Sequence, residues 1–69
     1  MAADIDFIAR NITRVGQIDL IRDCIDEEVH VGQLRIGDVY RKWAVRSGVN
    51  IGVKVFFEGS NLVFEGYLE

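Results

Sequence analysis

Four acidic residues in the first half of this 69-residue chain are the first candidates for chemistry: Asp19, Asp23, Asp26 and Glu27. Their spacing of three and four places them on one face of a helix predicted over residues 17–28. Such carboxylates can hold a divalent ion, but Ca²⁺ takes about six to eight oxygens, usually from a loop. General acid–base catalysis needs a carboxylate whose pKa a pocket has shifted. We therefore interpret the cluster as a solvated helix face.

Cys24 and His30 are the single cysteine and the single histidine of the chain. A nucleophilic cysteine needs a base within hydrogen-bond reach, and Cys24 lies instead on the apolar stripe of the predicted helix, as a small hydrophobic residue would. Two residues are too few for a zinc site, and the glycines match no phosphate-binding loop. We expect no enzymatic activity, no cofactor and no metal.

Basic residues gather in the middle of the chain, and they are candidates for nucleic-acid binding: Arg35, Arg41, Lys42 and Arg46. A basic helix over residues 38–47 followed by a hairpin resembles the recognition helix and wing of winged-helix DNA-binding domains, over residues 36–68. The resemblance implies a DNA-binding regulator. Against it, the hairpin tip has no arginine or lysine for a groove, and the acidic helix would repel phosphates. The alternative is that these bases offset the acids, within one chain or across a dimer.

The region from Val49 to Leu68 predicts an antiparallel hairpin, because apolar residues alternate with a period of two on both sides of a Gly59-Ser60 turn. This turn sets the register. On one face it pairs Phe57 with Leu62, Val55 with Phe64, Val53 with Gly66 and Ile51 with Leu68; on the other it pairs Phe56 with Val63, Lys54 with Glu65 and Gly52 with Tyr67.

The second hairpin face is unusually apolar, since Phe56, Val63 and Tyr67 sit beside one ion pair. A helix or the N-terminal tail could cover it, or it could be a contact surface for a second copy or another protein. An open hairpin edge could serve the same end by strand addition. Phe7, outside the stripe of its own predicted helix, either packs on a neighbour or is a further exposed anchor.

The remaining elements are predicted from apolar spacing and glycines. Residues 4–15 predict a helix that Gly16 breaks, and with the helix over 17–28 it would form an αα-hairpin, with a single bent helix as the alternative. Acids at the end of the second helix oppose its dipole, so we expect an early stop or a basic neighbour. The pattern of residues 29–36 is ambiguous, and this segment could be a short third strand of the sheet. Asp38 is the expected N-cap of the helix over 38–47, with a strand over 39–46 as the alternative.

These elements together predict one small α+β domain over residues 1–69, in the order α-α-β-α-β-β. Apolar residues make up 49% and charged residues 28% of the chain, as in globular proteins, and the formal net charge is −3. A single cysteine allows no internal disulfide and suits a reducing, cytoplasmic setting. No apolar run is long enough to span a membrane, and Met1–Asp6 lacks the pattern of a secretory signal.

The favoured hypothesis is a small non-enzymatic interaction protein of the kind that phages and mobile elements encode. It would act as a homo-oligomer or bind a protein target through Phe56, Val63, Tyr67 and Phe7. The second hypothesis is the DNA-binding regulator that uses Arg35, Arg41, Lys42 and Arg46.

Overall fold

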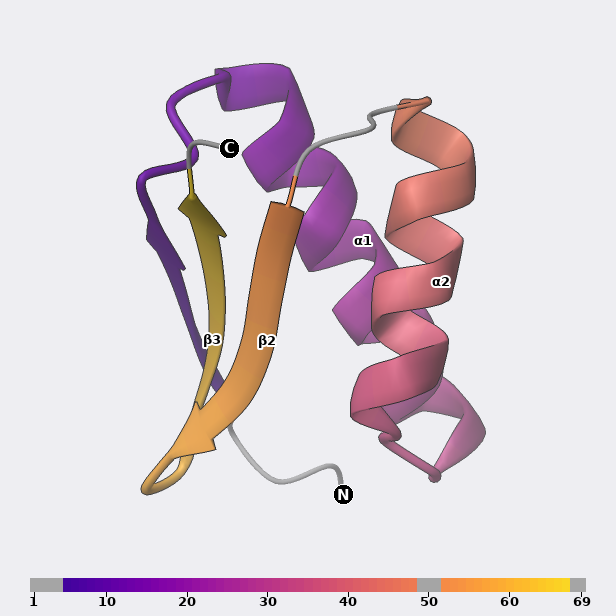
Figure 1. The fold of residues 1–69 in the computed structure, drawn as a ribbon. Helices are drawn as coiled ribbons and strands as arrows, with labels where there is room; N and C mark the ends of the chain where they lie inside the picture. The colour runs from indigo at the N-terminus through magenta and orange to yellow at the C-terminus, as the bar shows by residue number, and fades with distance from the viewer. Residues whose placement is uncertain (1–4, 49–51, 68–69) are drawn as a thin grey trace.

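Two helices pack on one face of a three-stranded sheet in the computed structural model, which describes residues 5–48 and 52–67 (Figure 1). The elements are β1 (Asp6–Arg10), α1 (Val15–Val31), α2 (Ile36–Ser47), β2 (Gly52–Glu58) and β3 (Asn61–Tyr67). β3 is the central strand; it runs antiparallel to β2 and parallel to β1. The predicted α+β class, with a C-terminal hairpin packed against helices, is confirmed.

The hairpin has the predicted register. Phe56 faces Val63, Lys54 faces Glu65 and Gly52 faces Tyr67. Gly59 adopts a φ of 64°, which suits the first central position of a tight primed turn and which glycine reaches without steric cost. The expected pair of Ile51 with Leu68 lies outside the described residues.

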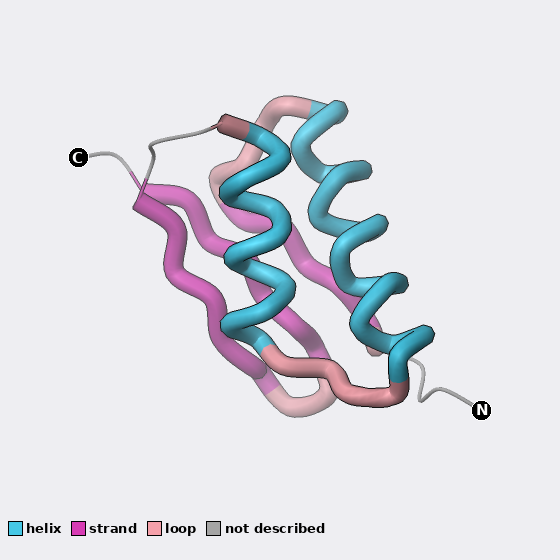
Figure 2. Tube along the Cα trace, turned by 90° about the vertical axis from the view of Figure 1, so that its right-hand side faces the viewer, coloured by secondary structure: helices cyan, strands magenta, loops and turns pink. Residues whose placement is uncertain are grey.

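The core lies between the helices and one face of the sheet (Figure 2). Leu62 and Phe64 of β3 are completely buried there. The Phe64 ring meets Trp43 of α2 edge to face at 5.8 Å between centroids, and it meets Phe7 of β1 in the same way at 5.9 Å. Because these contacts join both layers, the central strand organises the core.

The prediction of a helix over residues 4–15 is wrong, because residues 6–10 form β1. The helical spacing of apolar residues there was fortuitous: Ile5, Phe7 and Ala9 pack on the core, whereas Ile8 lies on the opposite face of the sheet. A period of two therefore runs through this segment as well. The five residues of β1 are held in a strand conformation by pairing with β3, and the local sequence does not specify that pairing.

The predicted helix over 17–28 exists but is longer, since α1 runs from Val15 to Val31. Gly16 does not break a helix; it lies in the first turn of α1. The predicted strand over 29–36 is wrong, because α1 continues into that segment and α2 begins at its end. Gly32, at a φ of 84°, ends α1: its N–H donates to Val29 and the next N–H donates to Glu28, as in a Schellman motif.

The helix predicted over 38–47 is confirmed, and the alternative strand over 39–46 is excluded. Asp38 is not the N-cap. Arg35 holds that position, and its carbonyl accepts hydrogen bonds from the N–H groups of Asp38 and Val39. Asp38 lies in the first turn instead, where its charge still favours the helix dipole. The αα-hairpin consists of α1 and α2, not of the two segments expected to form it.

Asn11, directly after β1, has a φ of 59°, a left-handed conformation that costs most residues about 1–2 kcal/mol. We predict that Asn11→Val lowers the unfolding free energy by about 1–2 kcal/mol, measured by urea denaturation. Asn11→Gly is the matched control and should change stability by less than about 0.5 kcal/mol. Equal losses in the two variants would contradict this account of the turn.

Candidate interaction surfaces

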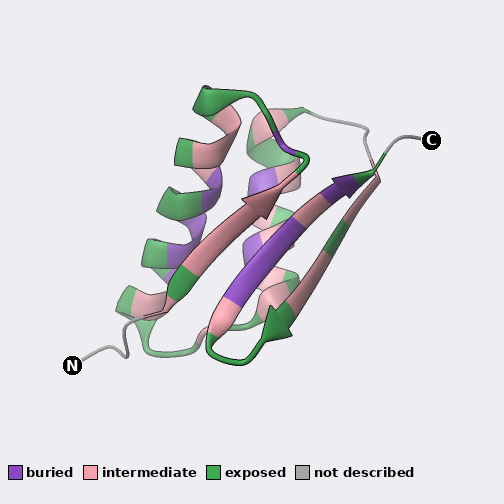
Figure 3. Ribbon diagram, turned by 90° about the vertical axis from the view of Figure 1, so that its left-hand side faces the viewer, coloured by how far each residue is buried: buried purple, intermediate pink, exposed green. Residues whose placement is uncertain are grey.

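The face of the sheet turned away from both helices is the first candidate surface, and Figure 3 looks onto it with the helices behind. We call it the open face. Its residues lie outside the core cluster and come from all three strands: Asp6, Ile8, Arg10, Gly52, Lys54, Phe56, Glu58, Asn61, Val63, Glu65 and Tyr67. Neither α1 nor α2 covers this face.

Strand register arranges most of the open face into three rows across the sheet. The middle row is apolar and consists of Ile8, Val63 and Phe56. On one side lies an acidic row, Asp6, Asn61 and Glu58. On the other side lies a row with two bases around one acid, Arg10, Glu65 and Lys54. An apolar band thus separates an end of negative charge from an end of net positive charge.

An ion pair crosses the apolar row. The Arg10 guanidinium donates two hydrogen bonds, of 2.9 and 2.7 Å, to the Glu58 carboxylate. Arg10 lies on β1 level with Glu65, whereas Glu58 lies on β2 level with Asn61. A side chain joining them must pass over β3 at Val63, which is 0% exposed. The Arg10 side chain therefore covers part of Val63, and neither helix contributes to that cover.

The same pair sets the protonation of both groups. The hydrogen bond from Arg10, opposed by partial desolvation, holds the pKa of the Glu58 carboxyl below its ordinary value of 4.5. The hydrogen bond to Glu58 likewise raises the pKa of Arg10, so both groups are charged at neutral pH. Glu65 adds a weaker contact, 4.0 Å from the Arg10 guanidinium.

Tyr67 and Phe56 provide the aromatic surface of the open face. Tyr67 is 53% exposed, and its ring lies against Gly52 so closely that a Cβ at Gly52 would overlap it. Phe56 is half-buried, with the Lys54 ammonium 5.1 Å from its ring centroid. The two rings extend the apolar surface beyond the covered Val63.

Three of the four predicted partner-binding residues, Phe56, Val63 and Tyr67, share the open face, but Phe7 does not. Phe7 packs in the core against Phe64, and its ring lies 6.0 Å from the Arg22 guanidinium. The alternative that Phe7 packs on a neighbour is therefore the observed one. The sequence prediction missed Ile8, Arg10 and Glu58. The first two join this face because β1 pairs with β3, a pairing that the apolar spacing of residues 5–10 did not reveal.

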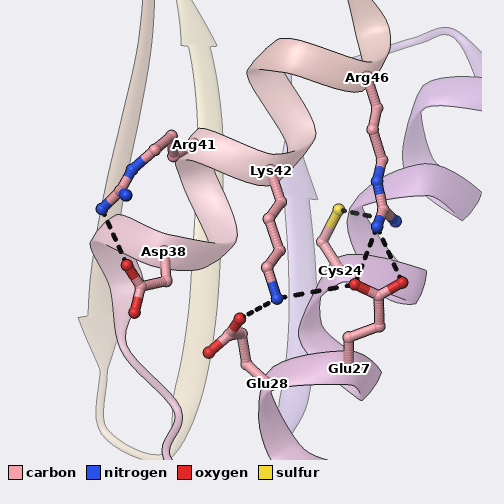
Figure 4. Close-up of polar contacts among 7 residues, drawn as sticks. All are labelled: Cys24, Glu27, Glu28, Asp38, Arg41, Lys42 and Arg46. Atoms are coloured by element: carbon pink, nitrogen blue, oxygen red, sulfur yellow. Dashed lines mark hydrogen bonds and ion pairs between the residues drawn. The ribbon is translucent and has the colours of Figure 1, made fainter.

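The basic cluster is the second candidate surface, and Figure 4 shows that three of its members reach carboxylates of this chain. Arg46 contacts Glu27 at 2.9 Å, and Lys42 lies between Glu27, at 3.7 Å, and Glu28. Arg41 contacts Asp38 on its own helix at 2.9 Å. The fourth base, Arg35, is exposed at the start of α2.

Contacts between α1 and α2 therefore supply the basic neighbour expected near the end of the acidic helix. Lys42 and Arg46 offset acids of α1 within one chain, which is the alternative to nucleic-acid binding raised above. Glu28 is the buried member, at 6% exposure, and Lys42 supplies its counter-charge. The hydrogen bond to Glu28 raises the pKa of Lys42.

Cys24 lies beneath these ion pairs as a free, buried thiol in the core cluster. The Arg46 guanidinium approaches its sulfur at 3.9 Å. Burial raises the pKa of the thiol, and the charge of Arg46 opposes that shift. In residues 5–48 and 52–67, no three histidine, cysteine, aspartate or glutamate side chains are grouped as a metal site would require.

Comparison of the chain with protein-family models, curated proteins and solved structures finds no match. Over the described part of the chain, neither helix has the length and apolar character needed to cross a bilayer. The two surfaces above are therefore the basis for a proposal of function.

We predict that the Arg10–Glu58 pair stabilises the fold in a pH-dependent way. The pKa of Glu58 is lowered in the folded chain, so the pair contributes fully at pH values well above 4.5 and is lost as the pH falls through the folded-state pKa. The stability difference between wild type and Glu58→Gln in urea should therefore shrink on acidification. In an NMR titration, Arg10→Gln should raise the Glu58 midpoint to its ordinary value of 4.5 or above, because desolvation then acts unopposed; an unchanged midpoint would contradict the assignment.

We also predict that Lys42→Met destabilises the chain more than Arg41→Met, because only the former leaves a buried carboxylate without its counter-charge. The difference in melting temperature should be about 5 °C or more. Adding Glu28→Gln to Lys42→Met should recover much of the loss in thermal denaturation. No recovery in the double variant would mean that Lys42 acts through another contact.

Proposed function

We propose that this chain is a small non-enzymatic protein-interaction module whose working surface is the open face. The observation that carries the proposal is the apolar row of Ile8, Val63 and Phe56, extended by the half-exposed Tyr67, on a face that neither α1 nor α2 covers. A face of this kind in a two-layer fold is usually more polar. A protein partner would bury the aromatic rings and use the flanking charges for orientation.

DNA binding is supported less well. Arg41, Lys42 and Arg46 each contact a carboxylate of the same chain, so a phosphate would have to displace that carboxylate. The exposed acids of α1 lie beside this cluster and would weaken the attraction further. We therefore do not propose a nucleic-acid partner.

The cellular setting that fits the proposal is the cytoplasm. Cys24 is the single cysteine and lies in the core as a free thiol, a state that a reducing compartment maintains. A phage or mobile-element origin stays a prediction drawn from size and composition.

Site-specific photo-crosslinking tests the proposal. A photoreactive phenylalanine analogue at Phe56 or Tyr67 should give a discrete covalent adduct with a protein in the cell of origin. The same analogue at Val45, which is 78% exposed on α2, is the matched control and should give none. Mass spectrometry then identifies the adduct as this chain or another protein. Equal labelling at all three positions, or no adduct from the open face, would refute the proposal.

A further inference from the structure

We propose that the occupant of the open face is a second copy of this chain, packed face to face with its strands antiparallel to those of the first. This inference rests on the proposed function and names its partner. It is carried by the charge pattern of the three rows, which is complementary to itself in one of the two orientations that align the strands.

When the strands of the two sheets are aligned, two-fold symmetry leaves two ways to stack the open face on a second copy. With the axis along the strands, each row lies over its own twin and β1 lies over β2. Asp6 would then face Glu58 and Arg10 would face Lys54 of the second copy, so both outer rows would oppose like charges.

With the axis along the apolar row, the outcome reverses. The apolar rows still meet, but the acidic row of each copy lies over the basic row of the other. Lys54 then faces Glu58 of the second copy, and Arg10 faces Asp6 of the second copy. The tilt of about 30° between packed sheets shifts these positions without changing the signs of the facing charges.

Association must also accommodate the Arg10–Glu58 pair, which lies over Val63 in the single chain. For the apolar rows to meet, the Arg10 side chain has to leave Glu58. In the antiparallel arrangement both groups regain a partner, since Asp6 of the second copy faces Arg10 and Lys54 of the second copy faces Glu58. The intramolecular pair is thus exchanged for intermolecular ones.

The size of the face predicts a weak dimer. Three strands spaced about 4.8 Å apart present a smaller area than the roughly 800 Å² per partner of a standard interface. We therefore expect a dissociation constant of about 10–100 µM. Rapid exchange between monomer and dimer suits a module that can also release its partner.

Analytical ultracentrifugation of two charge-reversal variants tests the arrangement. Lys54→Glu sets two carboxylates against each other at the contact with Glu58 of a second copy, and Glu58→Lys sets two ammonium groups against each other there. Each variant alone should associate at least about tenfold more weakly than wild type. An equimolar mixture of the two should associate again, because each variant carries the charge that the other lacks. Arg41→Glu and Asp26→Lys, exposed and off the open face, are the matched controls and should associate like wild type.

Each other outcome overturns a different statement. A wild-type chain that stays monomeric to about 500 µM, well above the expected constant, overturns the second copy as occupant, while crosslinking at Phe56 to another protein would still support the proposed function. Weak single variants without rescue in the mixture overturn the antiparallel arrangement. Association that neither these variants nor Phe56→Glu disturbs overturns the open face itself as the interface.

Discussion

Burial of Phe64 between Trp43 and Phe7 is the contact on which the rest of this structure depends. It joins the central strand to a helix on one side of the core and to the edge strand β1 on the other. A chain of 69 residues has few such contacts, since about 60% of its unfolded surface is all that it can bury. Both helices pack on this face of the sheet, and among residues 5–48 and 52–67 the opposite face is covered only by side chains of its own strands.

Ion pairs supplement the apolar packing on both sides of the sheet. Between the helices, Lys42 offsets the buried Glu28 near the end of α1, where acids oppose the helix dipole. On the open face, the Arg10–Glu58 pair spans the apolar row. The first pair fixes one helix against the other, whereas the second is exposed to solvent and can exchange partners. This difference explains why the open face, rather than the helix pair, is the surface on which association is proposed.

The C-terminal hairpin and the helix over 36–47 could be predicted closely because their determinants are local. Alternation and Gly59 specify the register of the hairpin, and Gly48 ends the second helix in a left-handed conformation. The N-terminal strand could not be predicted in this way. Residues 6–10 carry apolar side chains at spacings that fit a helix as well as a strand, and only the vacant edge of β3 decides between them.

The residues of the open face divide in the same way: some could be assigned from the sequence, and others only from the tertiary structure. By itself the sequence determined that Phe56, Val63 and Tyr67 share one hairpin face, because the period of a strand and the turn between 58 and 61 are properties of a short segment. Only the tertiary structure decided that Ile8 and Arg10 join that face, that Phe7 leaves it for the core, and that the bases of α2 meet acids of α1. Those outcomes depend on contacts between segments far apart in the chain. The free energies of such contacts cannot be inferred from the pattern of residues within one short segment.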